Sequence, residues 1–293
     1  MDSALTTIGL PIALGIIMFG LGLSLTVQDF RDVRRAPKAV LVALACQLLL
    51  LPAVCFGLVL LLDLPPLLAV GMMLLSASPG GTSANLYSHL FRGDVALNVS
   101  LTAVNSVLAI VTLPLITNLS IGYFGLADSV DLQFRKVVEV FVVVLGPVLL
   151  GMLVRSRWPA FASRMDRPVR TASALILLVL VLGVLLDQRE HVVDYLGQVG
   201  LVTTLFCLAS LLVGFFVPRA AGVTDRQAIA CSFEIGVHNA TLAIYVAVEV
   251  LDSVEMSVPG AVYGLLMFVY AAVWGLMLTR WILPRRSARL SAP

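Results

Sequence analysis

Charged side chains are scarce in this chain of 293 residues. Asp, Glu, Lys and Arg make up 12% of the sequence, against about 25% in average soluble domains. Hydrophobic residues make up 60%, and the mean hydropathy is +1.03. An oversized soluble core is a poor explanation, because single cores stop growing near this length. The composition predicts an integral membrane protein whose outer surface faces the lipid bilayer.

Residues that build metal centres and catalytic sites are also few. The cysteines have no CxxC spacing and lie in apolar stretches, which is typical of buried small hydrophobes: Cys46, Cys55, Cys207 and Cys231. The three histidines are spread over separate parts of the chain: His89, His191 and His238. Neither HExxH nor GxSxG occurs, so we expect neither an enzyme nor a cofactor-binding protein. A net charge of +2 gives no reason to expect a nucleic-acid partner.

Long apolar stretches are what the sequence has instead. A membrane span needs about 20 mostly apolar residues, and nine stretches qualify: 7–27, 39–62, 66–88, 95–120, 137–154, 171–187, 198–217, 227–250 and 258–280. We expect helices, because backbone groups in lipid must be paired within their own segment and the alternation of barrel strands is absent. The first stretch lacks the positive start and cleavage site of a signal peptide, so we expect it to be retained as a span.

Lys and Arg fall mostly on one side of a nine-span chain. In such a chain, alternate connections between spans lie on the same side of the membrane. Sixteen of the 19 Lys and Arg residues lie on one side, and three lie on the other: Arg135, Lys136 and Arg189. Cytoplasmic loops carry the excess of positive charge. The sequence therefore predicts a plasma (inner) membrane protein with its N-terminus outside and its C-terminus in the cytoplasm.

Two of the nine stretches are interrupted near their middle. The third contains PGGTSAN (79–85) and the eighth contains EIGVHN (234–239). Glu234 lies about a third of the way into its stretch, and an ionisable residue at such depth is a functional candidate by default. Unwound backbone frees carbonyls for a cation and exposes helix N-termini that favour anions. Matched interruptions in the two halves indicate a secondary transporter with inverted repeats, the alternative being a pair of packing kinks.

Further polar side chains occur at membrane depth. Gln47 lies inside the second stretch, where a role as an interhelical hydrogen-bond donor is the alternative to a site. Asn98, Thr102 and Asn105 follow the i, i+4, i+7 spacing of one helix face, and Thr112 extends that face. This pattern fits a site at the bundle interior and fits helix–helix contacts equally well.

Several of these stretches resemble, in order, those of the bile acid:sodium symporter family. They are GIIMFGLGLSLTVQDF (15–30), Gln47, PGGTSAN followed by FRGDVALNVSLTAV (91–104), and EIGVHNATLA (234–243). The resemblance implies an all-α membrane fold of nine helices, the family form that lacks its first helix. It also implies two broken helices that cross near the midplane. A panel domain would comprise 1–27 and 137–187 (spans 1, 5 and 6), and a core domain 39–120 and 198–282.

The resemblance implies two sodium sites behind the crossing. The first would use Asn85, Asn98, Thr102 and Glu234. The second would use Gln47, Glu234, His238 and the backbone carbonyls of Ile235 and Val237. The substrate would contact Thr82, Ser83 and Asn239, and the helix breaks would fall at Pro79, Gly80, Gly81 and Gly236.

The chain departs from the family pattern at three of these positions. Ala84 and Asn98 stand where the family often has Ser, and His238 stands where it usually has Gln. An imidazole nitrogen is a poorer partner for a hard cation than an amide oxygen. We expect a sodium-coupled symporter of an organic anion, bile-acid-like or a small carboxylate, that works by alternating access. The alternatives are proton coupling through His238, uncoupled transport, or a sensor or channel of the same fold.

Overall fold

The computed structural model describes residues 10–126, 134–187 and 192–282, and these ranges are built of helices. One isolated β-bridge joins Gly80 to His238 within them. The prediction of an all-α chain is confirmed for these residues. Residues 1–9, which include the start of the first predicted stretch, lie outside the described part, as do Arg189 and His191.

The first half of the chain forms seven α-helices. They are α1 (Leu10–Ser24), α2 (Val27–Asp32), α3 (Pro37–Ala45), α4 (Leu51–Leu61), α5 (Pro66–Ala77), α6 (Thr82–Leu90) and α7 (Val95–Tyr123), and a π-helical turn, Cys46–Leu50, joins α3 to α4. Pro66 stands at the first position of α5, where a missing N–H costs nothing. Asp94 caps α7 by accepting a hydrogen bond from the N–H of Leu97 at 3.1 Å.

The second half contains six more α-helices. They are α8 (Phe134–Arg157), α9 (Pro159–Asp187), α10 (Val192–Ala220), α11 (Asp225–Gly236), α12 (Ala240–Tyr245) and α13 (Val258–Met277), and a π-helical turn, Val246–Val250, extends α12. Thr224 and Gln227 form a capping box at the start of α11. The sixth predicted stretch begins at 171, but α9 begins at Pro159, because an arginine-rich first part lowers its hydropathy without breaking the helix.

Four of the described helices are long and apolar enough to cross a membrane. They are Pro37–Leu61, Val95–Tyr123, Val199–Ala220 and Glu255–Arg280. A helix pair bent by 65°, Pro11–Ser24 with Val27–Arg35, meets the same criteria when it is counted as one span. The protein is therefore a multi-pass membrane protein. The third and eighth predicted stretches are each divided into two shorter helices, so neither counts as one long span. That nine segments cross the membrane stays a prediction.

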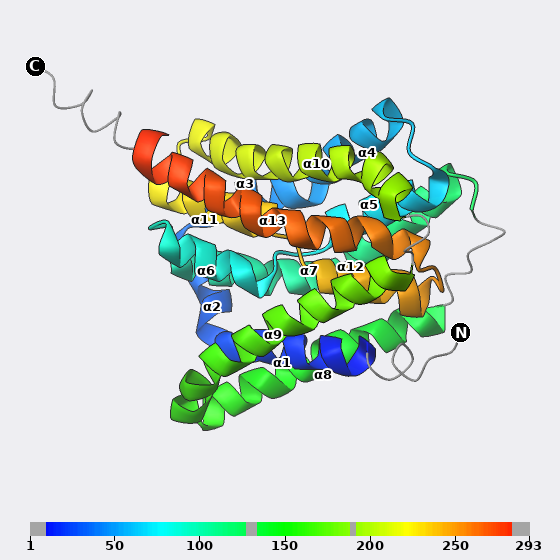
Figure 1. Ribbon diagram of the computed structural model, residues 1–293. Coiled ribbons are helices and arrows are strands. Elements are labelled where there is room, and N and C mark those ends of the chain that lie inside the picture. Colours follow the sequence, from blue (N-terminus) through cyan, green and yellow to red (C-terminus); the bar gives the residue numbers. More distant parts are fainter. Residues whose placement is uncertain (1–9, 127–133, 188–191, 283–293) are drawn as a thin grey trace, which may run out of the picture.

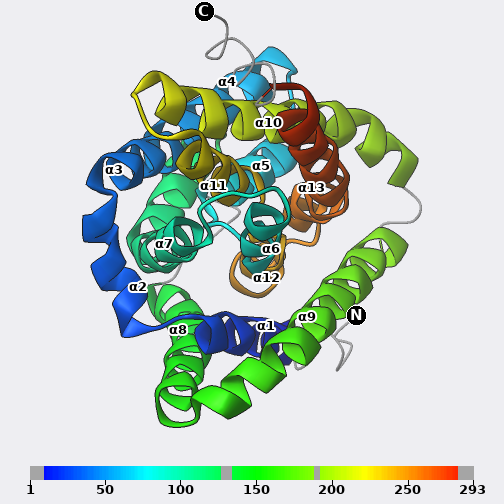
Figure 2. The same cartoon turned by 90° about the vertical axis from the view of Figure 1, so that its left-hand side faces the viewer.

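The helices form two groups (Figures 1 and 2). Helices α1, α8 and α9 pack on one another along one side, and the other helices gather on the opposite side. Gly22 of α1 and Gly151 of α8 bring their backbones together, since a β-carbon on either would overlap backbone atoms of the other helix. Small residues permit this close approach between membrane helices.

Candidate ion and substrate site at the crossing of two broken helices

The break between α5 and α6 meets the break between α11 and α12. The N–H of Gly81 donates to the carbonyl of Val237 at 2.7 Å, and the N–H of Asn239 donates to the carbonyl of Pro79 at 2.8 Å. Unwound backbone at membrane depth must find partners within the protein. The two interruptions, far apart in sequence, provide these partners for each other as a short antiparallel pair.

Glu234 lies beside this crossing, in the last turn of α11, and is fully buried. The hydroxyl of Thr102 donates to its Oε2 at 2.5 Å, and Nδ2 of Asn105 donates to its Oε1 at 3.2 Å. Both donors belong to α7. On another side the carboxylate contacts Gly80, where a β-carbon would overlap it. Three elements, α7, α11 and the first break, therefore fix the position of this carboxylate.

No cationic side chain accompanies Glu234 in the described part of the chain. Two ion pairs lie wholly within that part, Arg35 with Asp32 and Arg219 with Asp225, and Glu234 takes part in neither. A buried carboxylate costs several kcal/mol unless a proton or a cation neutralises it. The side chain is thus suited to bind a small cation.

Four amide oxygens of the predicted site and its polar helix face are buried and have no hydrogen-bond partner among the described residues: Gln47 Oε1, Asn85 Oδ1, Asn98 Oδ1 and Asn105 Oδ1. Hydrogen bonds from their nitrogens orient three of these amides. Gln47 donates to Ser78 O at 3.0 Å, Asn98 to Ala230 O at 2.8 Å and Asn105 to Glu234 Oε1 at 3.2 Å. Since the nitrogens are engaged, the oxygens are left for a ligand. Uncharged amide oxygens together with one carboxylate are the donor types that a hard cation prefers, and this set fits sodium.

His238 and Gln47 share one acceptor. Nδ1 of His238 lies 3.1 Å from the Ser78 carbonyl, which Gln47 also contacts. A carbonyl only accepts, so Nδ1 carries the hydrogen, and in the neutral ring Nε2 is then an acceptor. Nε2 has no partner in the described structure, and the ring stacks on Phe206 at 5.4 Å. His238 therefore offers a nitrogen lone pair, whereas the resemblance described above implies an amide at this position.

The structure places the predicted sodium ligands in two groups. Thr102 contacts both Glu234 and the backbone carbonyl of Asn98 with its hydroxyl, and Gln47 meets His238 through Ser78. The Asn98 side chain donates to the carbonyl of Ala230, and Asn85 lies on α6 with its Oδ1 buried. The Val237 carbonyl already accepts from Gly81. Ile235 is in the last turn of α11, where carbonyls lack helical partners.

Two further residues of the site were not predicted. The sequence places Asn105 on a polar helix face but not among the sodium ligands. Its position three residues after Thr102, on the same face of the helix, is the signal that indicates it. Ser78 precedes Pro79, and its contribution is a backbone carbonyl, which no side-chain pattern reveals. Among the predicted substrate residues, Ser83 is partly exposed on α6, and the side chain of Thr82 lies outside the described part.

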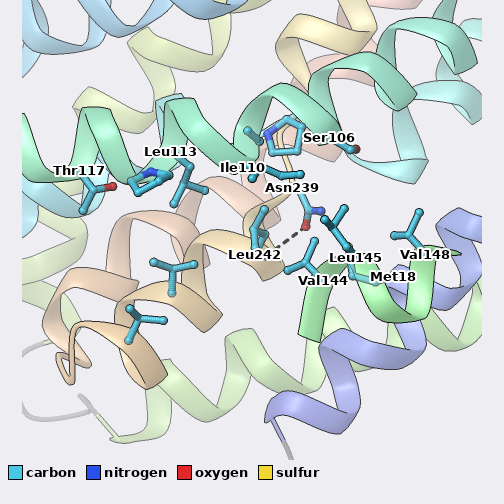
Figure 3. Close-up of a pocket in the computed structure, with 15 residues that line it drawn as sticks. Met18, Ser106, Ile110, Leu113, Thr117, Val144, Leu145, Val148, Asn239 and Leu242 are labelled. Atoms are coloured by element: carbon cyan, nitrogen blue, oxygen red, sulfur yellow. Dashed lines mark hydrogen bonds between the residues drawn. The ribbon is translucent and has the colours of Figure 1, made fainter. Parts of the chain in front are cut away.

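A partly open pocket adjoins the crossing, and the space within it is about 680 Å³ when the adjoining open solvent is included. It lies between α1 and α8 on one side and α7 and α12 on the other, and Pro79 and Asn239 bring the crossing to its wall (Figure 3). Its described lining is apolar except for Ser106, Thr117 and Asn239. Oδ1 of Asn239 caps α12 by accepting from Leu242 N–H at 3.1 Å. The group left to meet a ligand is its Nδ2, a donor that suits an anionic oxygen.

Comparison with known families gives one match. The sodium bile acid symporter family matches residues 11–195. The chain belongs to the sodium bile acid symporter family. The match spans α1 through the start of α10 and includes the first break, α7 and the cavity wall formed by α8.

Relatives within the symporter family are distant in sequence and align over most of this chain. A probable sodium/metabolite cotransporter of Arabidopsis thaliana chloroplasts is 29% identical over 271 residues, which is 90% of this chain and 66% of that protein. An uncharacterized sodium-dependent transporter of Bacillus subtilis is 29% identical over 87% of this chain and 78% of its own length. The human ileal sodium/bile acid cotransporter is 27% identical over 90% of this chain and 77% of its own length. This chain thus spans just under two thirds of the plant relative.

Proposed function

We propose that this protein is a secondary active transporter that carries an organic anion inward together with sodium. The observation that carries the proposal is the buried Glu234 carboxylate, held by Thr102 and Asn105, with unpartnered amide oxygens in the same group of residues and no described cation paired to it. Relatives that are named as sodium-dependent transporters and cotransporters support it. The proposal includes nine spans in a plasma (inner) membrane, with the N-terminus outside and the C-terminus in the cytoplasm.

Two sodium sites share Glu234 in this proposal. The first takes its oxygens from α6 and α7, through Asn85, Asn98 and Thr102. The second takes them from Gln47 and the last turn of α11, with His238 beside it. One carboxylate serves both sites, so the binding of sodium relieves the cost of burying that charge.

Sodium at these positions ties α6, α7 and α11 together directly behind the crossing. The substrate is proposed to bind on the other side of the crossing, at Asn239, Ser83 and Thr82. Sodium then favours the arrangement of the two breaks that binds substrate, which is coupling by differential affinity. Transport follows from movement of a panel of α1, α8 and α9 against a core of the remaining helices, as in other inverted-repeat transporters.

Uptake into proteoliposomes tests this function. Radiolabelled taurocholate and pyruvate serve as a large and a small anionic probe, with an inward gradient of sodium or of potassium. We expect sodium-dependent uptake of at least one probe. Glu234→Gln, which removes the charge and keeps the size, should abolish it. Glu255→Gln makes the same chemical change in the 3₁₀ turn before α13 and should leave uptake unchanged.

Thermal unfolding in detergent provides a second measurement. Wild type should gain stability with sodium over potassium by mass action, and Glu234→Gln should not. Uptake driven by a pH gradient in the absence of sodium would show that protons, and not sodium, are the coupling ion. Equal uptake in sodium and potassium, with no pH effect, would rule out the proposed coupling altogether.

A further inference from the structure

The second break follows a glycine that its neighbour on α10 requires. Gly236 is the last residue of α11, and a β-carbon on it would overlap the side chain of Leu211. Close packing of α10 against α11 therefore needs glycine at this position. Without a β-carbon, the backbone around Gly236 has a wide choice of φ and ψ. The peptide groups on both sides of Gly236 consequently depend on other contacts for their orientation.

Tyr263 of α13 supplies such a contact. Its hydroxyl donates to the Gly236 carbonyl at 2.9 Å, and its side chain is fully buried. Carbonyls in the last turn of a helix lack helical partners, so the hydroxyl satisfies a group that the break would leave unpaired. The Tyr263 ring packs against the rings of Phe206 and His238, with centroids 5.9 and 5.4 Å away. This packing fixes where the hydroxyl lies.

The carbonyls of the second break are held one by one. Three successive carbonyls accept hydrogen bonds from three different elements: Gly236 from Tyr263, Val237 from Gly81 and His238 from Ala240. The Ile235 carbonyl comes just before them and is one of the proposed sodium ligands. It belongs to the peptide group that joins Ile235 to Gly236. The direction of the Ile235 carbonyl therefore depends on how Gly236 is anchored, and Tyr263 is the anchor.

We propose that Tyr263 is a positioning residue of the second sodium site. By holding the Gly236 carbonyl, it directs the Ile235 carbonyl toward the ion and fixes the size of the space that the ion occupies. Tyr263 acts through the backbone and not as a ligand. This inference rests on the proposed function and deepens it, because it names a residue outside the ligand set that determines sodium affinity.

Tyr263→Phe removes the hydroxyl and keeps the ring between Phe206 and His238. Uptake of radiolabelled taurocholate and pyruvate into proteoliposomes is measured as a function of sodium concentration. We expect the sodium concentration for half-maximal uptake to rise about fivefold, a factor in the range of one neutral hydrogen bond. The maximal rate should stay within about twofold of wild type, because saturating sodium restores the population of the ion-bound form.

Lithium provides a readout that a loss of packing alone would not change. Selectivity between cations depends on the size and the flexibility of the ligand set. Wild type, whose carbonyls are held in place, should prefer sodium to the smaller lithium ion. Tyr263→Phe should reduce this preference, since a freed carbonyl can follow the smaller ion. The gain in Tm when sodium replaces potassium in detergent should also be smaller than in wild type.

Tyr270→Phe is the matched control. It makes the same chemical change farther along α13, but the hydroxyl of Tyr270 contacts the hydroxyl of Thr204 at 3.1 Å and not a carbonyl of the break. We expect its sodium dependence and its preference for sodium over lithium to equal those of wild type. Equal effects of the two variants would overturn the inference.

The remaining outcomes separate this inference from the proposed function. If wild type shows sodium-dependent uptake and Tyr263→Phe matches it in sodium and lithium dependence, the inference is wrong and sodium-coupled transport stands. A Tyr263→Phe protein that does not fold, or that has a lower Tm in both salts with unchanged sodium dependence, would give Tyr263 a purely structural role and also overturn the inference. If sodium has no effect on wild type, the proposed function fails and the inference fails with it.

Discussion

Gly80 and Glu234 are so close that a β-carbon on the glycine would overlap the carboxylate. The glycine comes from the break between α5 and α6, and the carboxylate comes from the end of α11. Close approach of backbone to a functional group requires glycine here, while its φ angle is not among the positive ones. The break between α5 and α6 therefore leaves room at Gly80 for the Glu234 carboxylate of the second half of the chain.

Gly80→Ala should displace the Glu234 carboxylate from Thr102 and Asn105. We expect sodium-dependent uptake in proteoliposomes to fall at least about tenfold, because a displacement of about 1 Å would misplace the carboxylate within the proposed sodium site. Gly57→Ala is the matched control, since a β-carbon at Gly57 meets no atom within 4 Å. If Gly80→Ala takes up the probe at the same rate and with the same sodium dependence as wild type, the crossing tolerates a side chain at that position.

Asn105 is expected to contribute to sodium affinity although it was not predicted as a ligand. Its nitrogen holds Oε1 of Glu234 at 3.2 Å and its oxygen is left unpartnered. Asn105→Ala should raise the sodium concentration for half-maximal uptake about tenfold, the loss expected for one hydrogen bond to a buried charge. The maximal rate at saturating sodium should change less.

Ser100→Ala provides the comparison for Asn105→Ala. Ser100 is buried on the same helix, but among the described residues its hydroxyl contacts only the Ala96 carbonyl, at 2.9 Å. We expect its sodium dependence to match that of wild type. Equal effects of the two variants would mean that packing of α7, and not the Asn105 amide, sets sodium affinity.

The polar residues of the site could be predicted from sequence more readily than their contacts. Pro79, Gly80 and Gly81 predicted a break, because these residues disfavour helix, and the structure places α5 and α6 on either side of it. Hydropathy alone located Glu234 as a charge at membrane depth. Which groups surround it depends on where the second break lies in space, and local sequence does not encode that position.

Asn105 and Ser78 illustrate this limit. Asn105 could equally be predicted to contact a neighbouring helix until Glu234 was placed beside it. Ser78 contributes its backbone carbonyl, which Gln47 and His238 contact from two other elements. The π-helical turn at Cys46–Leu50 that contains Gln47 is a further such case, since no local signal for it exists in an apolar stretch.

Gly151→Ala should destabilise the packing of α1 against α8. A β-carbon at Gly151 would overlap the carbonyl of Phe19 and lie 2.8 Å from backbone atoms of Gly22 and Leu23. Backbone atoms cannot move aside cheaply, so we expect a loss of about 1–3 kcal/mol in the free energy of unfolding. Thermal unfolding in detergent measures this as a lower Tm. Gly146→Ala on the same helix meets no atom within 4 Å and should leave the Tm equal or slightly higher.

His238→Gln should strengthen the proposed second sodium site. In wild type Nδ1 of His238 donates to the Ser78 carbonyl, so only a nitrogen acceptor is left. Glutamine can donate to the same carbonyl with its nitrogen and still present an amide oxygen, which a hard cation prefers. We expect the sodium concentration for half-maximal uptake to fall by up to about tenfold, the factor that corresponds to ~1.4 kcal/mol. His89→Gln changes an exposed histidine at the end of α6 and should have no effect. A His238→Gln protein that needs more sodium than wild type would mean that the imidazole, stacked on Phe206, holds the crossing in the form that binds the ion.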